Sequence, residues 1–150
     1  MDSTASLNKE LKTAHAAAYF NIITTSSKIE TKTKEALKAF KLTHAQLNVL
    51  SILMQNHPRP VSARELKEKI LVSNPDVTRL LDRLVKIGLV QRETCPENRR
   101  KIDIGITDTG QALYIKAHNA AKVAVNNYFE DQITVEEAQE LRRILHKIQK

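Results

Sequence analysis

Hydrophobic residues near both ends of the chain recur at three- and four-residue intervals, the spacing of one face of an α-helix. Near the N-terminus this pattern runs from residue 7 to about residue 41 and is interrupted by a polar patch at residues 24–27. It predicts one long helix over 7–41, with the polar patch as the place where it would kink. After residue 107 the same spacing predicts a second long helix, and a terminal helix begins after Thr134.

The middle of the chain predicts shorter elements. All three Gly and four Pro residues lie between residues 58 and 110, so the turns are concentrated there. The order Thr43 to Gln46 and the order Ser62 to Glu65 are both typical of a capping box, in which two side chains satisfy backbone N–H groups at a helix start. We therefore expect helices over about 43–56 and 62–70.

A third short helix is predicted to follow the second at once. Ser73 or Asn74 would cap it, Pro75 would occupy its first turn, and Asp76 would face its positive end. Val77, Leu80, Leu81 and Leu84 have helical spacing, and Gly88 is expected to end the helix in a left-handed conformation.

The pattern then changes to a period of two over residues 89–94 and 101–106, which predicts a β-hairpin across the turn at 95–100. Two short helices followed by a hairpin make a winged helix-turn-helix. Its second helix can enter the major groove of DNA, while the hairpin reaches the neighbouring backbone or minor groove.

Composition adds a net charge of +7, from 24 Lys and Arg against 17 Asp and Glu, which is compatible with nucleic-acid binding but also with an ordinary basic protein. A chain of 150 residues is expected to form one soluble domain, and a single cysteine excludes a disulfide scaffold. The most apolar stretch, residues 14–23, is too short for a membrane span of about 20 residues. With no signal-peptide pattern, we expect a cytoplasmic protein and no membrane contact.

The candidate DNA-binding residues lie on the second short helix and at the hairpin tip. Arg79 can pair with guanine, Thr78 can contact a phosphate, a base or a thymine methyl, and Arg83 or Lys86 suits phosphate. The alternative is an ordinary surface helix with an Asp82–Lys86 ion pair, and a solvated hairpin turn. The full candidate set is Ser73, Asn74, Pro75, Asp76, Thr78, Arg79, Arg83, Lys86, Arg99, Arg100 and Lys101.

Three segments resemble the MarR family of transcriptional regulators. Residues 42–50, LTHAQLNVL, are similar to the family's LTxxQxxVL segment, and residues 73–92 are similar to its recognition helix and the strand after it. Residues 96–110 resemble its wing pattern, but Cys95 and Asn98 stand where the family has acidic residues. As a substitute, Asp82 is predicted to pair with Arg100 and brace the wing.

The resemblance implies a mainly α fold with a small β-hairpin wing, in which residues 42–110 form a DNA-binding lobe and 1–41 and 111–150 form a helical dimerisation region of one domain, 1–150. It implies a homodimer that binds double-stranded DNA sequence-specifically at a pseudo-palindromic operator, as a ligand-responsive repressor. Long apolar faces on the terminal helices agree with a dimer. A small aromatic or anionic ligand would bind beside His15, Tyr19, Phe20 and His44, and the alternative is that Tyr19 and Phe20 are core or dimer packing.

Other functions are less well supported by the sequence. The five histidines lack metal-ligand spacing, so no metal or cofactor is expected, and no catalytic constellation indicates an enzyme. Cys95 is either incidental or a thiol sensor in the wing. The competing interpretation is a winged-helix adaptor or architectural module that acts through protein contacts or non-specific DNA binding.

Overall fold

The computed structural model describes residues 13–71, 76–98 and 101–150. Its helices are α2 (Ala14–Leu37), α3 (His44–Asn56), α4 (Ala63–Lys69), α5 (Val77–Lys86), α6 (Asp108–Glu130) and α7 (Val135–Ile148), with a short 3-10 turn, η1 (Lys38–Phe40). Its strands are β1 (Val61–Ser62), β2 (Val90–Thr94) and β3 (Ile102–Ile106). The mainly helical class with a hairpin wing is confirmed.

The N-terminal helix α2 ends before the predicted limit of about residue 41, and residues 7–12 of the predicted span of 7–41 lie outside the described residues. It begins at Ala14, because Thr13 has extended backbone angles and its hydroxyl accepts a hydrogen bond from the Ala16 N–H. It continues unbroken through the polar patch at 24–27 and ends at Leu37. After η1, Lys41 adopts a left-handed conformation with φ of 54°, which turns the chain toward α3.

Three capping boxes begin α3, α4 and α7, as their local sequences predict. In each one the N-cap hydroxyl accepts from a backbone N–H three residues on, and the Gln or Glu at that position accepts from the N-cap N–H. The start of α5 differs from prediction. Its N-cap is Asp76 and not the predicted Ser73 or Asn74: the Asp76 carboxylate accepts from the Arg79 N–H at 3.1 Å, and the helix begins at Val77. Ser73, Asn74 and Pro75 lie outside the described residues.

The sheet has three antiparallel strands in the order β1-β3-β2, so β1 is an addition to the predicted hairpin. Strand β3 passes into α6 through Thr107, whose hydroxyl donates to the Gly88 carbonyl at 2.7 Å and accepts from the Gly110 N–H at 3.0 Å. A Cβ on Gly110 would lie 2.0 Å from the Leu89 carbonyl oxygen, so only glycine allows this helix start to lie so close to the strand. Gly88 has a φ of 75°, the predicted left-handed helix stop.

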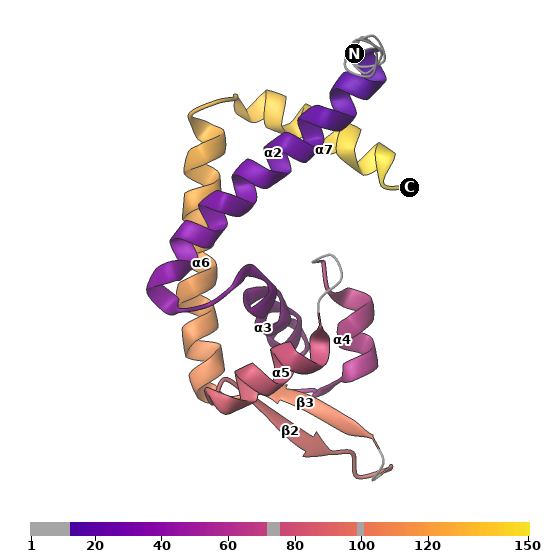
Figure 1. Cartoon of the computed structure of the whole chain (residues 1–150), viewed down its shortest axis with the longest axis vertical. Helices are drawn as coiled ribbons and strands as arrows, with labels where there is room; N and C mark the ends of the chain where they lie inside the picture. The colour runs from indigo at the N-terminus through magenta and orange to yellow at the C-terminus, as the bar shows by residue number, and fades with distance from the viewer. Residues whose placement is uncertain (1–12, 72–75, 99–100) are drawn as a thin grey trace, which may run out of the picture.

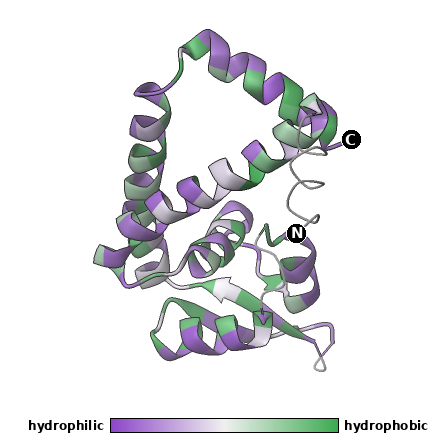
Figure 2. Cartoon of the chain, turned by 45° about the horizontal axis from the view of Figure 1, so that its top comes forward, coloured by the Kyte–Doolittle hydropathy of each residue, from purple (hydrophilic) through white to green (hydrophobic). Residues whose placement is uncertain are grey.

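The molecule has two parts (Figure 1). A lobe of α3, α4, α5 and the sheet contains most of the buried core, including Leu50, Leu66, Leu84 and Ile104. Above it, α2, α6 and α7 form an open frame, in which α2 packs along α6. All residues of α7 are described and none is buried, and Figure 2 shows hydrophobic residues on it and on the N-terminal half of α2. No helix in the described ranges is long and apolar enough to cross a membrane.

Candidate nucleic-acid interface

Helix α5 separates an apolar face from a polar one. Val77, Leu81 and Leu84 are buried in the lobe, so α5 is fixed by the core. The residues between them are exposed on the outside of the lobe and comprise Thr78, Arg79, Asp82, Arg83 and Lys86. These exposed α5 side chains, called here the reading face, are therefore accessible along the whole helix.

The exposed face of α5 is cationic. A shallow groove of about 730 Å³ is lined by Arg79, Asp82, Arg83, Lys86 and Ile87, which recur at three- and four-residue spacing. Among the described residues no ion pair engages Arg79, Arg83 or Lys86, so their charges stay available to a ligand. The alternative ion pair between Asp82 and Lys86 is not formed.

The carboxylate of Asp82 has a partner that the sequence did not predict. Arg92 on β2 donates from Nη2 to Asp82 Oδ1, and this ion pair joins α5 to the hairpin. Arg100 lies outside the described residues, so its pairing with Asp82 stays a prediction. The sequence could have indicated that Arg92 faces α5. Arg92 is two residues after the buried Val90, and residues two apart on a strand lie on the same face of the sheet.

The hairpin tip is closed by backbone hydrogen bonds. The Cys95 N–H donates to the Lys101 carbonyl at 3.1 Å, and the Lys101 N–H donates to the Asn98 carbonyl at 2.8 Å. Lys101 is exposed and lies directly before β3, so these bonds hold it at the tip end of the wing. Of the other predicted residues, Ser73, Asn74, Pro75, Arg99 and Arg100 lie outside the described ranges.

A second groove joins α5 to the beginning of α3. It holds about 290 Å³ and is lined by α5 residues, among them Arg79 and Arg83, and by Thr43, Ala45 and Gln46 of α3. Thr43 and Ala45 also line a third groove, of about 510 Å³. This groove contains Lys34 of α2, Lys38 of η1 and Lys41. Sequence reasoning missed this connection, because it depends on how the left-handed turn at Lys41 places α2 against α3.

The predicted ligand pocket is not assembled within one chain. His15, Tyr19 and Phe20 lie near the start of α2, and Tyr19 and Phe20 are 59% and 46% exposed, with ring centroids 5.2 Å apart. About 33 Å of helix separates His15 from Leu37 at the end of α2, and His44 follows at the start of α3. His44 lines the third groove described above, and neither His15, Tyr19 nor Phe20 lines it, so the ligand pocket stays a prediction.

The structure also describes the candidate metal ligands and the single thiol. Within the described ranges no three His, Cys, Asp or Glu side chains come together as a possible metal site. Cys95 is a free, partly buried thiol at the end of β2. The chemistry offered by this surface is that of hydrogen-bond donors and positive charge, which suits phosphate oxygens and base edges.

Comparison with known proteins identifies the fold and the family. The MarR family model matches residues 42–102. An uncharacterized HTH-type transcriptional regulator of Bacillus cereus (strain ATCC 10987) is 31% identical over 116 residues, which cover 77% of this chain and 76% of that protein. The regulator MgrA of Staphylococcus aureus is 28% identical over 115 residues, covering 76% of this chain and 74% of MgrA.

Solved structures agree. A mutant MarR from E. coli, complexed with operator DNA, superposes with a TM-score of 0.76 at 27% identity, covering 85% of this chain and 89% of that one. A MarR-like transcription regulator from Bacillus cereus ATCC 10987 has a TM-score of 0.80, covers 90% of this chain and 95% of its own, and at 19% identity shows the fold alone. These relatives are transcriptional regulators and not enzymes, and the chain belongs to the MarR family.

Proposed function

We propose that this protein is a sequence-specific transcriptional regulator that binds double-stranded DNA with α5 in the major groove. One observation carries the proposal: Arg79, Arg83 and Lys86 project from the solvent side of a helix whose opposite side is fixed in the core. An α-helix with its side chains is about 10–12 Å in diameter and so fits a major groove about 12 Å wide. The similar structure of E. coli MarR on operator DNA supports the same use of the fold.

The residues on α5 have different roles in this proposal. Arg79 is near the start of the helix, where recognition helices contact base edges, and its guanidinium can donate two hydrogen bonds to guanine. Thr78 lies beside it, while Arg83 and Lys86 are further along and suit backbone phosphates. The hairpin, with Lys101 at its end and Arg99 and Arg100 in its turn, is assigned to the flanking backbone or minor groove.

We also propose that the protein acts as a homodimer through α2, α6 and α7. An apolar groove of about 450 Å³ between α2 and α7 is lined by Ile22, Ile29, Leu141, Ile144 and other residues. Leu141, Ile144 and Ile148 are 39%, 42% and 65% exposed in the single chain. Apolar surface of this kind on a terminal helix indicates an interface, and a second copy covers it with no further component.

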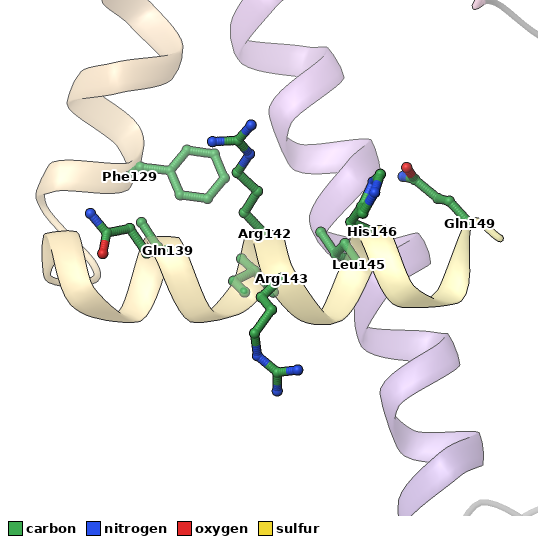
Figure 3. Close-up of a pocket in the computed structure, with 9 residues that line it drawn as sticks. Phe129, Gln139, Arg142, Arg143, Leu145, His146 and Gln149 are labelled. Carbon is green, nitrogen blue, oxygen red and sulfur yellow. The ribbon is translucent and has the colours of Figure 1, made fainter.

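A further groove on α7 is continuous with this apolar surface. It holds about 690 Å³, and Figure 3 shows Phe129 from the end of α6 lying above α7 near Arg142, with Leu145 and His146 further along the helix. Phe129, Leu141 and Leu145 line both grooves. In a dimer, this surface would receive helices of the partner and place two α5 helices on one face.

Two copies of α5 would read two half-sites of a pseudo-palindrome. Binding over a promoter would block transcription, so repression is the proposed outcome. A small aromatic or anionic ligand would release the DNA by binding beside Tyr19 and Phe20, whose rings are exposed in the single chain. His15 and His44 stay candidates for this site only where the dimer brings different chains together.

Selection of bound sequences from random duplexes, at a stated salt concentration, tests the proposal. We expect enrichment of a pseudo-palindrome with half-sites about 34–36 Å apart. Binding without any enriched sequence would instead support an architectural module, and no binding would support a protein adaptor. A reporter gene behind the selected sequence distinguishes repression from activation.

A further inference from the structure

Three lysines lie between the last turn of α2 and the beginning of α3. We call Lys34, Lys38 and Lys41 together the cationic corner. All three lysines are exposed and line the groove of about 510 Å³. Glu30 is the one carboxylate among the residues that line this groove. Within the described ranges no ion pair engages the three lysines, so the corner holds positive charge that nothing described in the chain neutralises.

Local geometry holds these charges together. Lys34 and Lys38 are four residues apart along the end of α2 and η1, so they lie about 6 Å apart along the helix axis. Lys41 joins them because it takes the left-handed conformation, with φ of 54°, which few residues other than glycine adopt. The corner is therefore produced by the same turn that starts α3.

The corner is continuous with the proposed reading face. Thr43 and Ala45 line both the groove that contains the three lysines and the groove that contains Arg79 and Arg83. Figure 1 shows the α2–α3 turn on one side of α5 and the outer ends of β2 and β3 on the other. A duplex bound along α5 would thus have cations beyond both sides of the helix.

We propose that the cationic corner contacts backbone phosphates of the bound DNA on the side of α5 opposite the hairpin. This inference rests on the proposed function and adds a second phosphate-binding surface to it. Along one strand a phosphate recurs about every 3.4 Å of axis, so the axial separation of Lys34 and Lys38 spans about two nucleotides. Long, exposed ammonium groups suit such a backbone because they need no fixed hydrogen-bond geometry.

A small anion fits the corner less well than DNA does. Sites for small molecules bury most of the ligand and converge a few polar groups on it. Here all three lysines are exposed, and no described buried side-chain nitrogen or oxygen atom lacks a hydrogen-bond partner. The corner is an open surface and not an enclosed pocket.

The test compares a triple variant, Lys34→Gln with Lys38→Gln and Lys41→Gln, with the wild type on the selected operator. Each phosphate that the variant no longer neutralises should lower the slope of log K against log salt by about 0.9, so the slope should fall by about two to three per protomer. The matched control replaces Lys116, Lys122 and Lys147, which line none of these grooves, by Gln. It carries the same charge change and should keep the wild-type slope.

Ethylation interference gives a second, positional readout. Wild-type protein should show interfering phosphates on both sides of the segment read by α5. The triple variant should show no interference on one side, and Lys101→Ala should weaken the interference on the other. A double variant, Lys34→Gln with Lys38→Gln, tests the corner without altering the left-handed turn at Lys41. Thermal unfolding establishes that each variant folds. An unchanged slope with an unchanged interference pattern would overturn the proposal.

The outcomes separate this inference from the proposed function. If selection enriches no sequence, the proposed function fails, and the slope can still be compared on random duplex. If wild type binds selectively but the triple variant keeps its slope, only the cationic corner is wrong. Inorganic phosphate that raises the unfolding temperature of wild type but not of the triple variant, with equal slopes, would assign the corner to a small anion instead.

Discussion

Arg92 on β2 donates a hydrogen bond to the carboxylate of Asp82 on α5, across ten residues of sequence, and so connects the hairpin to the helix beside it. The side chains of Arg92 and Asp82 are 38% and 57% exposed. Exposed ion pairs stabilise proteins by about 0–1 kcal/mol. The pair therefore matters more for the direction of the hairpin than for the stability of the lobe.

Double-mutant cycles can identify the partner of Asp82. Combining Asp82→Asn with Arg92→Gln should give a coupling free energy of unfolding below about 1 kcal/mol but different from zero. The same cycle with Arg100→Gln tests the predicted wing brace. Coupling to Arg100 and none to Arg92, measured by urea unfolding, would mean that the Asp82–Arg92 pair does not form in solution.

Arg79→Ala should separate specificity from general affinity. Removing a bidentate donor should cost about 1–3 kcal/mol on the selected operator and relax the preference for one base pair. Lys101→Ala is the comparison, because removing a phosphate-binding cation should weaken all sequences alike and reduce the salt slope by about one. Titrations of both variants on operator and mismatched duplexes measure the affinity and the base preference. An unchanged base preference in Arg79→Ala would show that another residue contacts that base pair.

Ile144→Glu should convert the protein to a monomer. The substitution places a carboxylate in the apolar groove between α2 and α7, where a partner would have to desolvate it. Val135→Glu on the same helix is the matched control, since Val135 is 68% exposed and lines neither groove of α7. Light scattering at micromolar concentration should give a dimer mass for the control, and a dimer mass for Ile144→Glu would contradict this interface.

Gly110→Ala should destabilise the lobe by about 1–3 kcal/mol, because its Cβ would meet the Leu89 carbonyl oxygen at 2.0 Å and force the strand and helix apart. Gly88→Asn is the control: its Cβ has open space, and asparagine tolerates the left-handed conformation. Thermal unfolding should show a clearly larger drop for Gly110→Ala. Equal melting temperatures would mean that the helix start moves away at little cost.

The start of α4 should lose stability in acid. The Ser62 N–H donates to the Glu65 carboxylate at 3.1 Å and Arg59 lies at 3.2 Å, and together they lower the pKa of Glu65. Because the pKa of Glu65 is lower in the folded protein, its carboxylate stabilises the fold at pH values above its unfolded pKa of 4.5. This stabilisation is lost as the pH falls through the folded pKa. Glu65→Gln should therefore flatten the decline in unfolding free energy below about pH 4.5.

Urea unfolding over about pH 3 to 7 measures this effect. Glu68→Gln on the same helix is a suitable control, because Glu68 pairs with Arg64 and accepts no backbone N–H at the helix start. Its pH profile should match that of wild type. An identical decline in Glu65→Gln and wild type would show that the carboxylate does not contribute at this cap.

Features that depend on neighbouring residues could be predicted from the sequence. The capping boxes at Thr43, Ser62 and Thr134 all form, because the groups that satisfy one another are three residues apart. The cap of α5 could not be chosen with the same certainty, since Ser73, Asn74 and Asp76 all offer a suitable oxygen. The structure selects Asp76.

Features that depend on tertiary contacts were missed. Strand β1 is two residues long and exists through pairing with β3, more than forty residues later. Likewise, the cationic corner depends on the left-handed turn at Lys41, and the link between Asp82 and Arg92 depends on how the sheet meets α5. Periodicity finds which face of α5 is exposed, but it does not show which other elements extend that face.

The junction at Thr107 has a mechanical consequence. The central strand of the sheet continues into α6 with one residue between them, and that residue is bonded to both Gly88 and Gly110. The connection between β3 and α6 is therefore rigid. A tilt of α6 must move the hairpin, through β3, and the end of α5, through Gly88. In a dimer held through α6 and α7, the distance between the two α5 helices would thus be set by the angle of α6.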